Sequence, residues 1–356
     1  MRKRRRLSLV DVVSLALGLG ILAFVVVGVF LTLTKSEAPL SPRQWLDLVV
    51  FGLAQGSVYA LIALGYTLVY GVLFMINFAH GDVFMFGAMT SFFVANALAS
   101  PDPATGASFL NSSPLIGMLL VLATAALSSM IVAILLERIA YRPLRRAPRL
   151  VPLITAIGAS LFISNSVRGL YGEQVKAYPR LDVLQGPWTI FGYEILPSHA
   201  IVIVSAVILM AVLWWFVQKT KTGRSMRAVA ENKDTAALMG INVDRVIATT
   251  FAIGGLLAGA AGVLYAIVFN QVSWTIGFLP GIKAFTAAVL GGIGNIVGAM
   301  IGGVLLGTME SVAPTLLLSG YGVPSPTQLK DVIAFSVLVL VLIFRPSGLL
   351  GEPENK

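Results

Sequence analysis

Apolar and polar segments alternate along this chain in blocks that are too long for a soluble fold. A helix needs about 20 apolar residues to cross the hydrocarbon core of a membrane. Apolar runs of this kind occupy residues 7–34, 45–71, 74–99, 114–136, 151–170, 201–217, 246–269, 281–318 and 329–344. The run at 281–318 has room for one short and one full crossing. The pattern therefore predicts about nine or ten transmembrane helices, some of them broken by glycine.

The composition indicates the same class of protein. The chain has 356 residues, of which 57% are hydrophobic and only 12% are charged, and this excludes an ordinary soluble domain. We therefore expect an all-α polytopic membrane protein. Cysteine is absent, which excludes disulfides and thiolate metal sites. The two histidines, His80 and His199, lie far apart in the sequence, so no metal site is expected.

The apolar runs divide the chain into three parts. Residues 1–42 hold a basic start and an extra apolar span. This start would fit a signal peptide, but the apolar part is much longer than the ~7–15 residues of such a segment, and no small-x-small cleavage site follows. We expect an uncleaved first helix. Residues 43–351 then form the transmembrane domain, and residues 352–356 form a short tail.

The net charge of +9 would fit a nucleic-acid partner, but its distribution argues against one. Basic residues cluster beside apolar spans, as the positive-inside rule requires for cytoplasmic segments. With the N-terminus inside, eighteen of the 25 lysines and arginines fall in inner segments. The sequence thus predicts that both termini, and the loops after residues 136 and 217, lie in the cytoplasm.

The longest charged segment between two spans, residues 218–245, falls on this cytoplasmic side. We expect Gly223 to interrupt the chain and Ser225 to cap a short helix. Arg227 and Glu231 are four residues apart, a spacing that allows an ion pair on one helix face. These features favour an ordered helical segment over a flexible loop.

A second short helix is predicted in the same segment, at residues 235–239. It ends at Gly240, a residue type that readily adopts the left-handed conformation that stops helices. Asn242 can then cap the next span. A compact helical element held at a membrane surface is suited to docking. We expect its partner to be a soluble motor, because the chain lacks the G-x-x-x-x-G-K-[ST] motif that would bind ATP itself.

Polar residues interrupt the third apolar run, where Asn77, His80 and Asp82 lie beside Gly81. One interpretation is a translocation pathway, because polar groups at membrane depth survive only inside protein or along a wet cavity. The other is a solvated turn at the cytoplasmic interface, where the chain must turn between the second and third spans. A role for His80 as a metal ligand or proton relay finds no second ligand nearby.

Glycine is dense in the long apolar run, at residues 281–307. Gly294, Gly298 and Gly302 are four residues apart, which predicts a seam where two helices approach closely. The alternative is a broken helix at the centre of the subunit, and this adds Gly292 and Gly294 to the candidate pathway residues. Each half of the chain contains a span, a glycine-broken polar stretch and further spans, which suggests an inverted repeat.

The sequence shows no H-E-x-x-H motif, no G-x-S-x-G motif and no close pair of intramembrane carboxylates. We therefore expect no catalytic residues, no cofactor and no enzymatic activity in this chain. Four charged residues fall near predicted span ends and a fifth, Glu310, lies deeper; the four are Asp11, Asp47, Arg168 and Lys283. An ion-coupled carrier usually buries more ionisable groups, which argues against that class.

Four ordered stretches resemble a known family. They are residues 55–82, 137–146 (ERIAYRPLRR), 223–246 and 281–307, and the ending RPSGLLG at 345–351 also fits. They are similar to the LivH-type permease of branched-chain amino acid ABC importers. The resemblance covers the chain from about residue 45 to its end. The basic N-terminal span and the segment at 171–198 depart from it.

The resemblance implies a permease subunit that imports branched-chain or related apolar amino acids across a bacterial inner membrane. It implies as partners a second related permease, two cytoplasmic ATPases and an extracytoplasmic substrate-binding protein. The coupling residues that it implies are Gly223, Arg224, Arg227, Glu231, Gly240 and Ile241. Because related permeases carry urea, short amides or other amino acids, these solutes stay as alternatives. A stand-alone ion-coupled carrier or channel is a further alternative.

Overall fold

The computed structural model of the chain describes residues 9–351 except residues 36–39, 102–105, 107, 146, 149 and 191. The basic start of the chain and the tail expected at 352–356 lie outside the described residues. The long helices are α1 (Leu9–Lys35), α2 (Pro42–Leu73), α3 (His80–Ala99), α5 (Pro114–Leu136), α6 (Leu150–Tyr171), α7 (Pro197–Lys219), α10 (Val243–Phe269), α12 (Ile296–Leu318) and α13 (Lys330–Phe344).

Shorter elements connect these helices. Four are short α-helices: α4 (Phe109–Ser112), α8 (Lys221–Glu231), α9 (Lys233–Leu238) and α11 (Phe278–Gly291). One is a π-helical turn, η1 (Glu137–Tyr141), and four are 3₁₀ turns: η2 (Arg142–Leu144), η3 (Asp182–Leu184), η4 (Ser319–Tyr321) and η5 (Pro326–Leu329). Two antiparallel strand pairs join β1 (Lys176–Ala177) to β4 (Gln271–Val272) and β2 (Trp188–Ile190) to β3 (Tyr193–Ile195).

The helices confirm the predicted class. Eight described helices are long and apolar enough to cross a membrane, and two shorter apolar helical segments, Gly18–Thr34 and Phe278–Gly291, add to them. The apolar run at 281–318 is indeed one short helix followed by one full helix. The prediction of an all-α polytopic membrane protein with about nine or ten transmembrane helices is confirmed.

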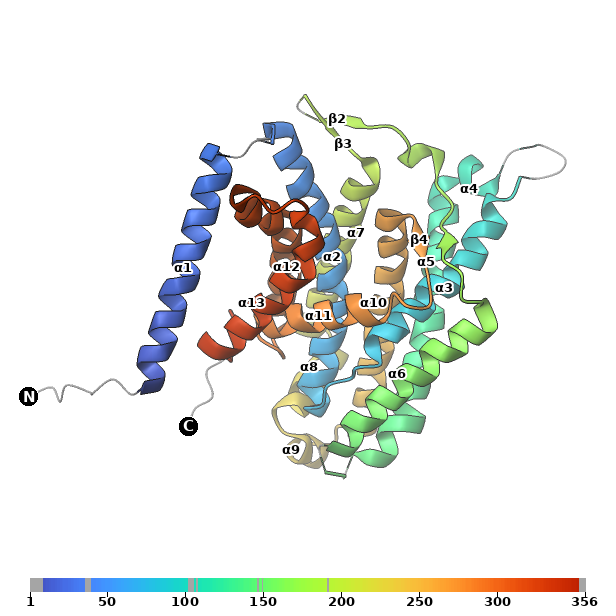
Figure 1. The fold of residues 1–356 in the computed structure, drawn as a ribbon. Coiled ribbons are helices and arrows are strands. Elements are labelled where there is room, and N and C mark those ends of the chain that lie inside the picture. Colours follow the sequence, from blue (N-terminus) through green and yellow to red (C-terminus); the bar gives the residue numbers. More distant parts are fainter. Residues whose placement is uncertain are drawn as a thin grey trace, which may run out of the picture.

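The helices α2 and α10 form the centre of the bundle (Figure 1). In the most apolar part of each of these two helices, 72% and 78% of the residues are buried. In the other long spans the buried share lies between 6% and 50%. A helix that is apolar all round and buried in protein belongs to a core. The more exposed helices, such as α6 and α13, therefore present their apolar faces outwards.

The two central helices end in the same unusual way. The residue after each helix, Phe74 after α2 and Asn270 after α10, adopts a left-handed conformation with φ of 57° and 54°. These are the only non-glycine residues with positive φ in the described part of the chain. After each of them the chain turns back towards the middle of the bundle and begins a new helix there, α3 or α11 (Figure 1).

The helix contacts in the first half of the chain also match those in the second half. The helix α2 packs along α12, as α10 packs along α5. The helix α3 contacts α5, α6 and α10, and α11 contacts α12, α13 and α2 in the equivalent way. The helix α2 runs towards the end that carries α8 and α9, whereas α10 runs away from it (Figure 1). The described helices thus support the inverted repeat suggested by the sequence.

Glycines allow the close packing of α12. Gly303 and Gly307 lie against the backbone of Ala60 and Gly56 in α2, while Gly298 and Gly302 lie against α11. The predicted seam is therefore present, but Gly294 does not belong to it. Gly294 precedes α12 and has a φ of +96°, because the chain turns there before the helix starts.

Two further predictions change in detail. The apolar run at 74–99 becomes helical only at His80, because residues 74–79 form an irregular linker between α2 and α3. The segment at 171–198 contains the hairpin β2–β3 and pairs through β1 with β4, the strand that follows α10. It lies at the end of the bundle opposite to α8 and α9 (Figure 1).

The glycine seam gives a testable stability difference. The substitution Gly307→Ala places a methyl group against the backbone of Gly56, where no flexible side chain can move away. We expect it to destabilise the protein by about 1–3 kcal/mol, the usual cost of overpacking a core. The control Gly169→Ala lies in α6, where no atom is within 4 Å of the added carbon. Equal thermal unfolding midpoints for the two purified variants would contradict this packing.

Candidate functional site

The helices α3 and α11 start at the same place in the middle of the bundle (Figure 1). Their backbones touch there. A side chain at Gly81 would collide with the carbonyl oxygen of Gly277, and its first carbon would lie 3.0 Å from the Cα atom of Gly281. Only glycine fits at such an approach. We call this contact of Gly81 with Gly277 and Gly281 the half-helix junction.

The polar residues near the junction are buried. Asn77, His80 and Asp82 are 3%, 2% and 4% exposed. The interpretation of this stretch as a solvated cytoplasmic turn is therefore wrong. The reason is that the linker carries the chain back into the bundle, where other helices cover these residues. Buried polar groups at this depth need partners inside the protein.

Two of the three residues have clear partners. The carboxylate of Asp82 accepts a hydrogen bond from the hydroxyl of Ser160 in α6. The side-chain oxygen of Asn77 accepts a hydrogen bond of 2.7 Å from the hydroxyl of Tyr141 in η1. Both bonds join α3 or its linker to distant parts of the sequence, so neither could be inferred from local pattern.

His80 fills space at the crossing of the two central helices. Its ring occupies the position that a side chain at Gly65 would take, and it lies 3.6 Å from the equivalent position at Gly254. The ring of Tyr66 meets it edge-on with centroids 5.0 Å apart. In the described part of the chain no group of three potential metal ligands surrounds it. These contacts indicate a packing role.

The other two candidate pathway glycines lie at the far end of α11. Gly292 and Gly294 have φ of +104° and +96° and form the turn before α12. Gly292 packs against the C-terminal segment at 347–351, which donates two backbone hydrogen bonds to the end of α11. At 1.5 Å per helical residue, Gly292 is roughly 15 Å from Gly281. The structure thus does not bring Gly292 and Gly294 close to the candidate residues 77–82.

A buried charged cluster anchors α11. Lys283 is 5% exposed and Glu310 is 2% exposed, and their side chains form an ion pair between α11 and α12. Lys283 also lies 2.6 Å from a carboxylate oxygen of Asp331 in the first turn of α13. Lys283 lies near the start of its helix, as expected, but α11 begins inside the bundle, so the residue is buried rather than at the surface.

The helices α8 and α9 form an elbow at one end of the bundle (Figure 1). The predicted start of α8 is wrong. Thr220, not Ser225, caps the helix and accepts a hydrogen bond of 3.0 Å from the backbone N–H of Gly223. Gly223 lies within the first turn of α8. A side chain there would collide with the carbonyl groups of Phe216 and Val217, so Gly223 permits the sharp bend from α7.

The expected ion pair on α8 is also absent from the described contacts. Arg227 donates instead to the side-chain oxygen of Gln218 at 2.7 Å, which ties α8 back to α7. The buried side of α8 is formed by Met226 and Val229, which are 2% and 0% exposed, and the helix packs on α7, α10 and α2. The elbow is therefore held to the membrane bundle as one body.

The second short helix is confirmed, although it spans Lys233–Leu238 rather than residues 235–239. The helix α9 is followed by Gly240, which has a φ of +82°. Asn242 caps α10 and accepts a hydrogen bond of 2.9 Å from the backbone N–H of Arg245.

The end of α9 carries an exposed apolar pair that the sequence analysis missed. Leu238 and Met239 are 88% and 78% exposed. Such apolar side chains on a polar surface are typical of a binding site.

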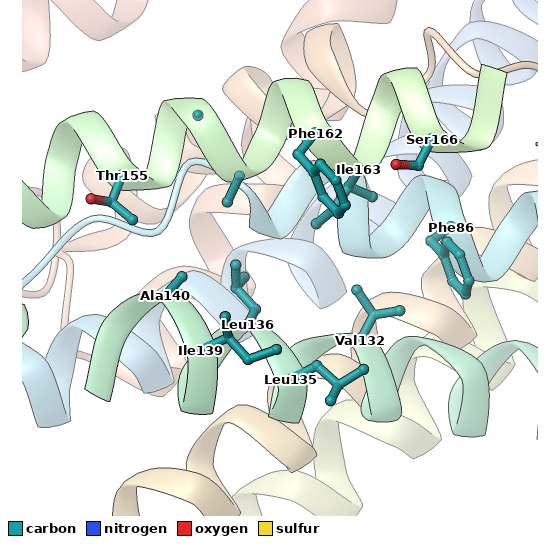
Figure 2. Close-up of a pocket in the computed structure, with 12 residues that line it drawn as sticks. Phe86, Val132, Leu135, Leu136, Ile139, Ala140, Thr155, Phe162, Ile163 and Ser166 are labelled. Carbon is teal, nitrogen blue, oxygen red and sulfur yellow. The ribbon is translucent and has the colours of Figure 1, made fainter. Parts of the chain in front are cut away.

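A wide groove of the described surface lies elsewhere, between α5 and α6. Figure 2 shows side chains of both helices, such as Leu135 and Phe162, together with Phe86 of α3. Its volume is about 540 Å³ and its lining is almost entirely apolar, with hydroxyls only at Thr155 and Ser166. Such a lining suits a surface that faces lipid tails or another apolar helix. Neither Asp82 nor His80 lines this groove.

Comparison with known proteins identifies the family. A family model described as "Branched-chain amino acid transport system / permease component" matches residues 48–342. The high-affinity branched-chain amino acid transport system permease protein BraD of Pseudomonas aeruginosa is 43% identical over 87% of this chain and 97% of its own length. The corresponding permease protein LivH of Escherichia coli strain K12 is 42% identical over 85% and 94%.

A more distant relative differs in its named solute. The autoinducer 2 import system permease protein LsrC of Escherichia coli O9:H4 is 32% identical over 39% of this chain and 40% of its own length. The family match covers most of the chain, and the full-length similarity is to the branched-chain amino acid permeases. The chain therefore belongs to the family of permease components of branched-chain amino acid transport systems.

Proposed function

We propose that this chain is the membrane-spanning permease subunit of an ATP-driven importer of branched-chain or related apolar amino acids. The observation that carries the proposal is the elbow of α8 and α9, an ordered docking element on a bundle whose relatives are amino-acid transport permeases. A second related permease would complete the membrane part. Two ATPases would dock on the elbows, and a binding protein would deliver the solute from outside.

The charge at the elbow end supports a cytoplasmic location for the elbow. Arg142, Arg145 and Lys233 all lie at this end with their partners. Basic residues concentrate on the cytoplasmic side of membrane proteins. This orientation places both termini of a bacterial inner-membrane protein in the cytoplasm, and the segment with β2 and β3 outside. The elbow would then face the compartment that contains ATP.

The coupling residues divide by what they do in the structure. Gly223, Gly240 and Arg227 shape the elbow, through a close approach, a left-handed turn and a bond to Gln218. Arg224 and Glu231 are exposed on α8 and are free to meet a partner surface. Ile241 is half-buried. We add Leu238 and Met239 as apolar contacts of the motor.

The pathway residues act through movement in this proposal. Asn77, His80 and Asp82 are closed to solvent in this conformation. A solute could therefore pass them only when the half-helix junction rearranges, as in alternating access. The glycine contact at Gly81 suits this, because two smooth backbones without interlocking side chains can slide. Urea, short amides or other amino acids remain alternative solutes within the same mechanism.

The docking proposal predicts a defect at the tip of α9. Replacing both exposed residues, Leu238→Ser with Met239→Ser, should weaken ATPase binding by about tenfold or more, since each docked apolar anchor typically contributes more than 1 kcal/mol. The measurement is the amount of ATPase that co-purifies with the permease, followed by solute uptake. Leu170→Ser is the matched control, because Leu170 is 79% exposed at the opposite end of the bundle. Wild-type ATPase recovery with the double variant would refute docking at this tip.

The turn after α9 gives a second prediction. Gly240→Ala forces a side chain into a left-handed conformation that costs about 1–2 kcal/mol, and Glu231→Gln removes an exposed charge of α8. Together we expect these changes to leave ATP hydrolysis in place while solute uptake falls. The measurement is uptake per ATP hydrolysed in reconstituted complexes. Uptake at the wild-type ratio would count against the elbow as the coupling element.

The alternative of a stand-alone carrier or channel is tested with the chain alone. Reconstituted in liposomes without any ATPase, the permease should show no solute flux down a gradient, because an importer of this kind opens only when its motor acts. The same liposomes with ATPases, binding protein and ATP are the positive control. Gradient-driven flux through the lone chain would favour the carrier or channel.

A further inference from the structure

The linker between α2 and α3, residues 74–79, is a non-helical segment that runs into the bundle from the side of the elbow. It begins at Phe74, beside the elbow, and ends directly before His80 and Gly81 at the half-helix junction. Non-helical backbone inside a membrane protein is tolerated only where it is buried in protein or lines a water-filled cavity. What holds the two ends of this linker therefore decides what can move the junction.

The elbow holds the first end of the linker. Lys233 in α9 approaches the carbonyl oxygen of Leu73 at 3.5 Å, and its ammonium group lies 5.7 Å from the centre of the Phe74 ring. Partial burial lowers the pKa of Lys233, and the positive charge of Arg145 lowers it further. The ammonium group is thus drawn out of water to reach the end of α2. A displacement of α9 acts directly on the start of the linker.

Tyr141 holds the second end. Its hydroxyl donates to the side-chain oxygen of Asn77 at 2.7 Å, and both residues are buried. The backbone carbonyl of Asn77 accepts from the N–H of His80 at 3.0 Å, so Asn77 belongs to the turn that starts α3. The ring of Tyr141 packs on Phe251 of α10 with centroids 5.6 Å apart. Tyr141 thus bridges α10 and the start of α3.

The segment that carries Tyr141 is bonded to the start of α10, which directly follows the elbow. Tyr141 ends the π-helical turn η1, and such turns are rare and occur frequently at functional sites. Glu137, at the start of η1, is 1% exposed and pairs with Arg145. Arg145 and Arg142 both bind the carboxylate of Asp244, in the first turn of α10 just after the elbow.

The equivalent linker in the other half is held differently. Residues 270–277 pair with the segment after α6, where Val272 of β4 faces Lys176 of β1. The guanidinium of Arg168 lies 5.0 Å from the centre of the Trp274 ring. These partners lie at the opposite end of the bundle from α8 and α9 (Figure 1). Within the described residues, the elbow therefore bonds to only one of the two linkers.

We propose that Tyr141 and Asn77 are positioning residues that couple the elbow to the half-helix junction. A push on the elbow shifts the start of α10 and, through Asp244 and Arg145, the turn η1. Tyr141 then carries this shift to Asn77 and so to the first turn of α3, where Gly81 meets α11. This inference rests on the proposed function, because it assigns a role within an ATP-driven importer.

The substitution Tyr141→Phe tests the proposal, because it removes one hydroxyl and keeps the ring packed on Phe251. The complete complex, with both ATPases and the binding protein, is reconstituted in liposomes. We expect basal ATP hydrolysis and the yield of assembled complex to stay at wild-type values. Uptake per ATP hydrolysed, and stimulation of hydrolysis by the loaded binding protein, should each fall by about fivefold, the effect of losing one net hydrogen bond.

Tyr178→Phe is the matched control. Tyr178 is buried, and its hydroxyl lies 3.1 Å from the hydroxyl of Ser91, so this variant also removes a tyrosine hydrogen bond to α3, but from the other end of the bundle. We expect uptake per ATP to be unchanged in this variant. An equal loss in Tyr178→Phe and Tyr141→Phe would overturn the proposal, because it would show only that α3 is sensitive to any lost contact.

A second variant approaches the same bond from its other side. Asn77→Val removes the acceptor, and the combination with Tyr141→Phe should be no worse than either single change, because partners in one bond are not additive. Additive losses, or wild-type coupling in Tyr141→Phe, would refute the inference. A wild-type complex that binds no ATPase or moves no solute would instead refute the proposed function, so the two failures are distinguishable.

Discussion

Irregular backbone inside a membrane must find its hydrogen bonds and its cover within the protein, and this constraint shapes the whole molecule. The linkers after Phe74 and Asn270 both enter the bundle, where no lipid can satisfy their polar groups. The structure meets the constraint by letting two backbones meet at Gly81, Gly277 and Gly281. The central helices and their glycine-rich neighbours then close around this contact. The buried polar residues are a consequence of that arrangement.

The sequence predicted the elements because their signals are local. Span lengths, the cap at Asn242 and the turn at Gly240 depend on neighbouring residues alone. Two of the errors have a common cause in contacts between residues distant in the sequence. Asn77 and Asp82 looked like turn residues, because Tyr141 and Ser160, which bury them, lie 64 and 78 residues away. Arg227 bonds Gln218, nine residues earlier, since the bend between α7 and α8 brings them together, and a helical spacing rule does not consider that bend.

The exposed tip of α9 was missed for a different reason. Apolar residues are common throughout this chain, so Leu238 and Met239 carry no signal by type. Their exposure becomes meaningful only when the elbow is seen to leave the apolar bundle. The two side chains are 88% and 78% exposed. Exposing apolar surface to water costs free energy, and burying it against a bound partner recovers that free energy. Analysis of the sequence therefore located the elbow, while the exposed apolar pair at its tip required the structure.

The two half-helices are held with unequal strength. Lys283 joins α11 to α12 through the buried carboxylate of Glu310 and to α13 through the partly exposed carboxylate of Asp331. Breaking a buried pair such as Lys283–Glu310 costs about 3–5 kcal/mol. The anchors of α3 are single hydrogen bonds, among them those from Ser129 and Ser160 and the one between Ser91 and Tyr178, which typically contribute about 0.5–3 kcal/mol each. If one side of the junction is to slide, the weaker anchors favour α3. The linker of α3 is also the one that contacts the elbow, so the more weakly anchored half-helix is the one that a displacement of the elbow reaches.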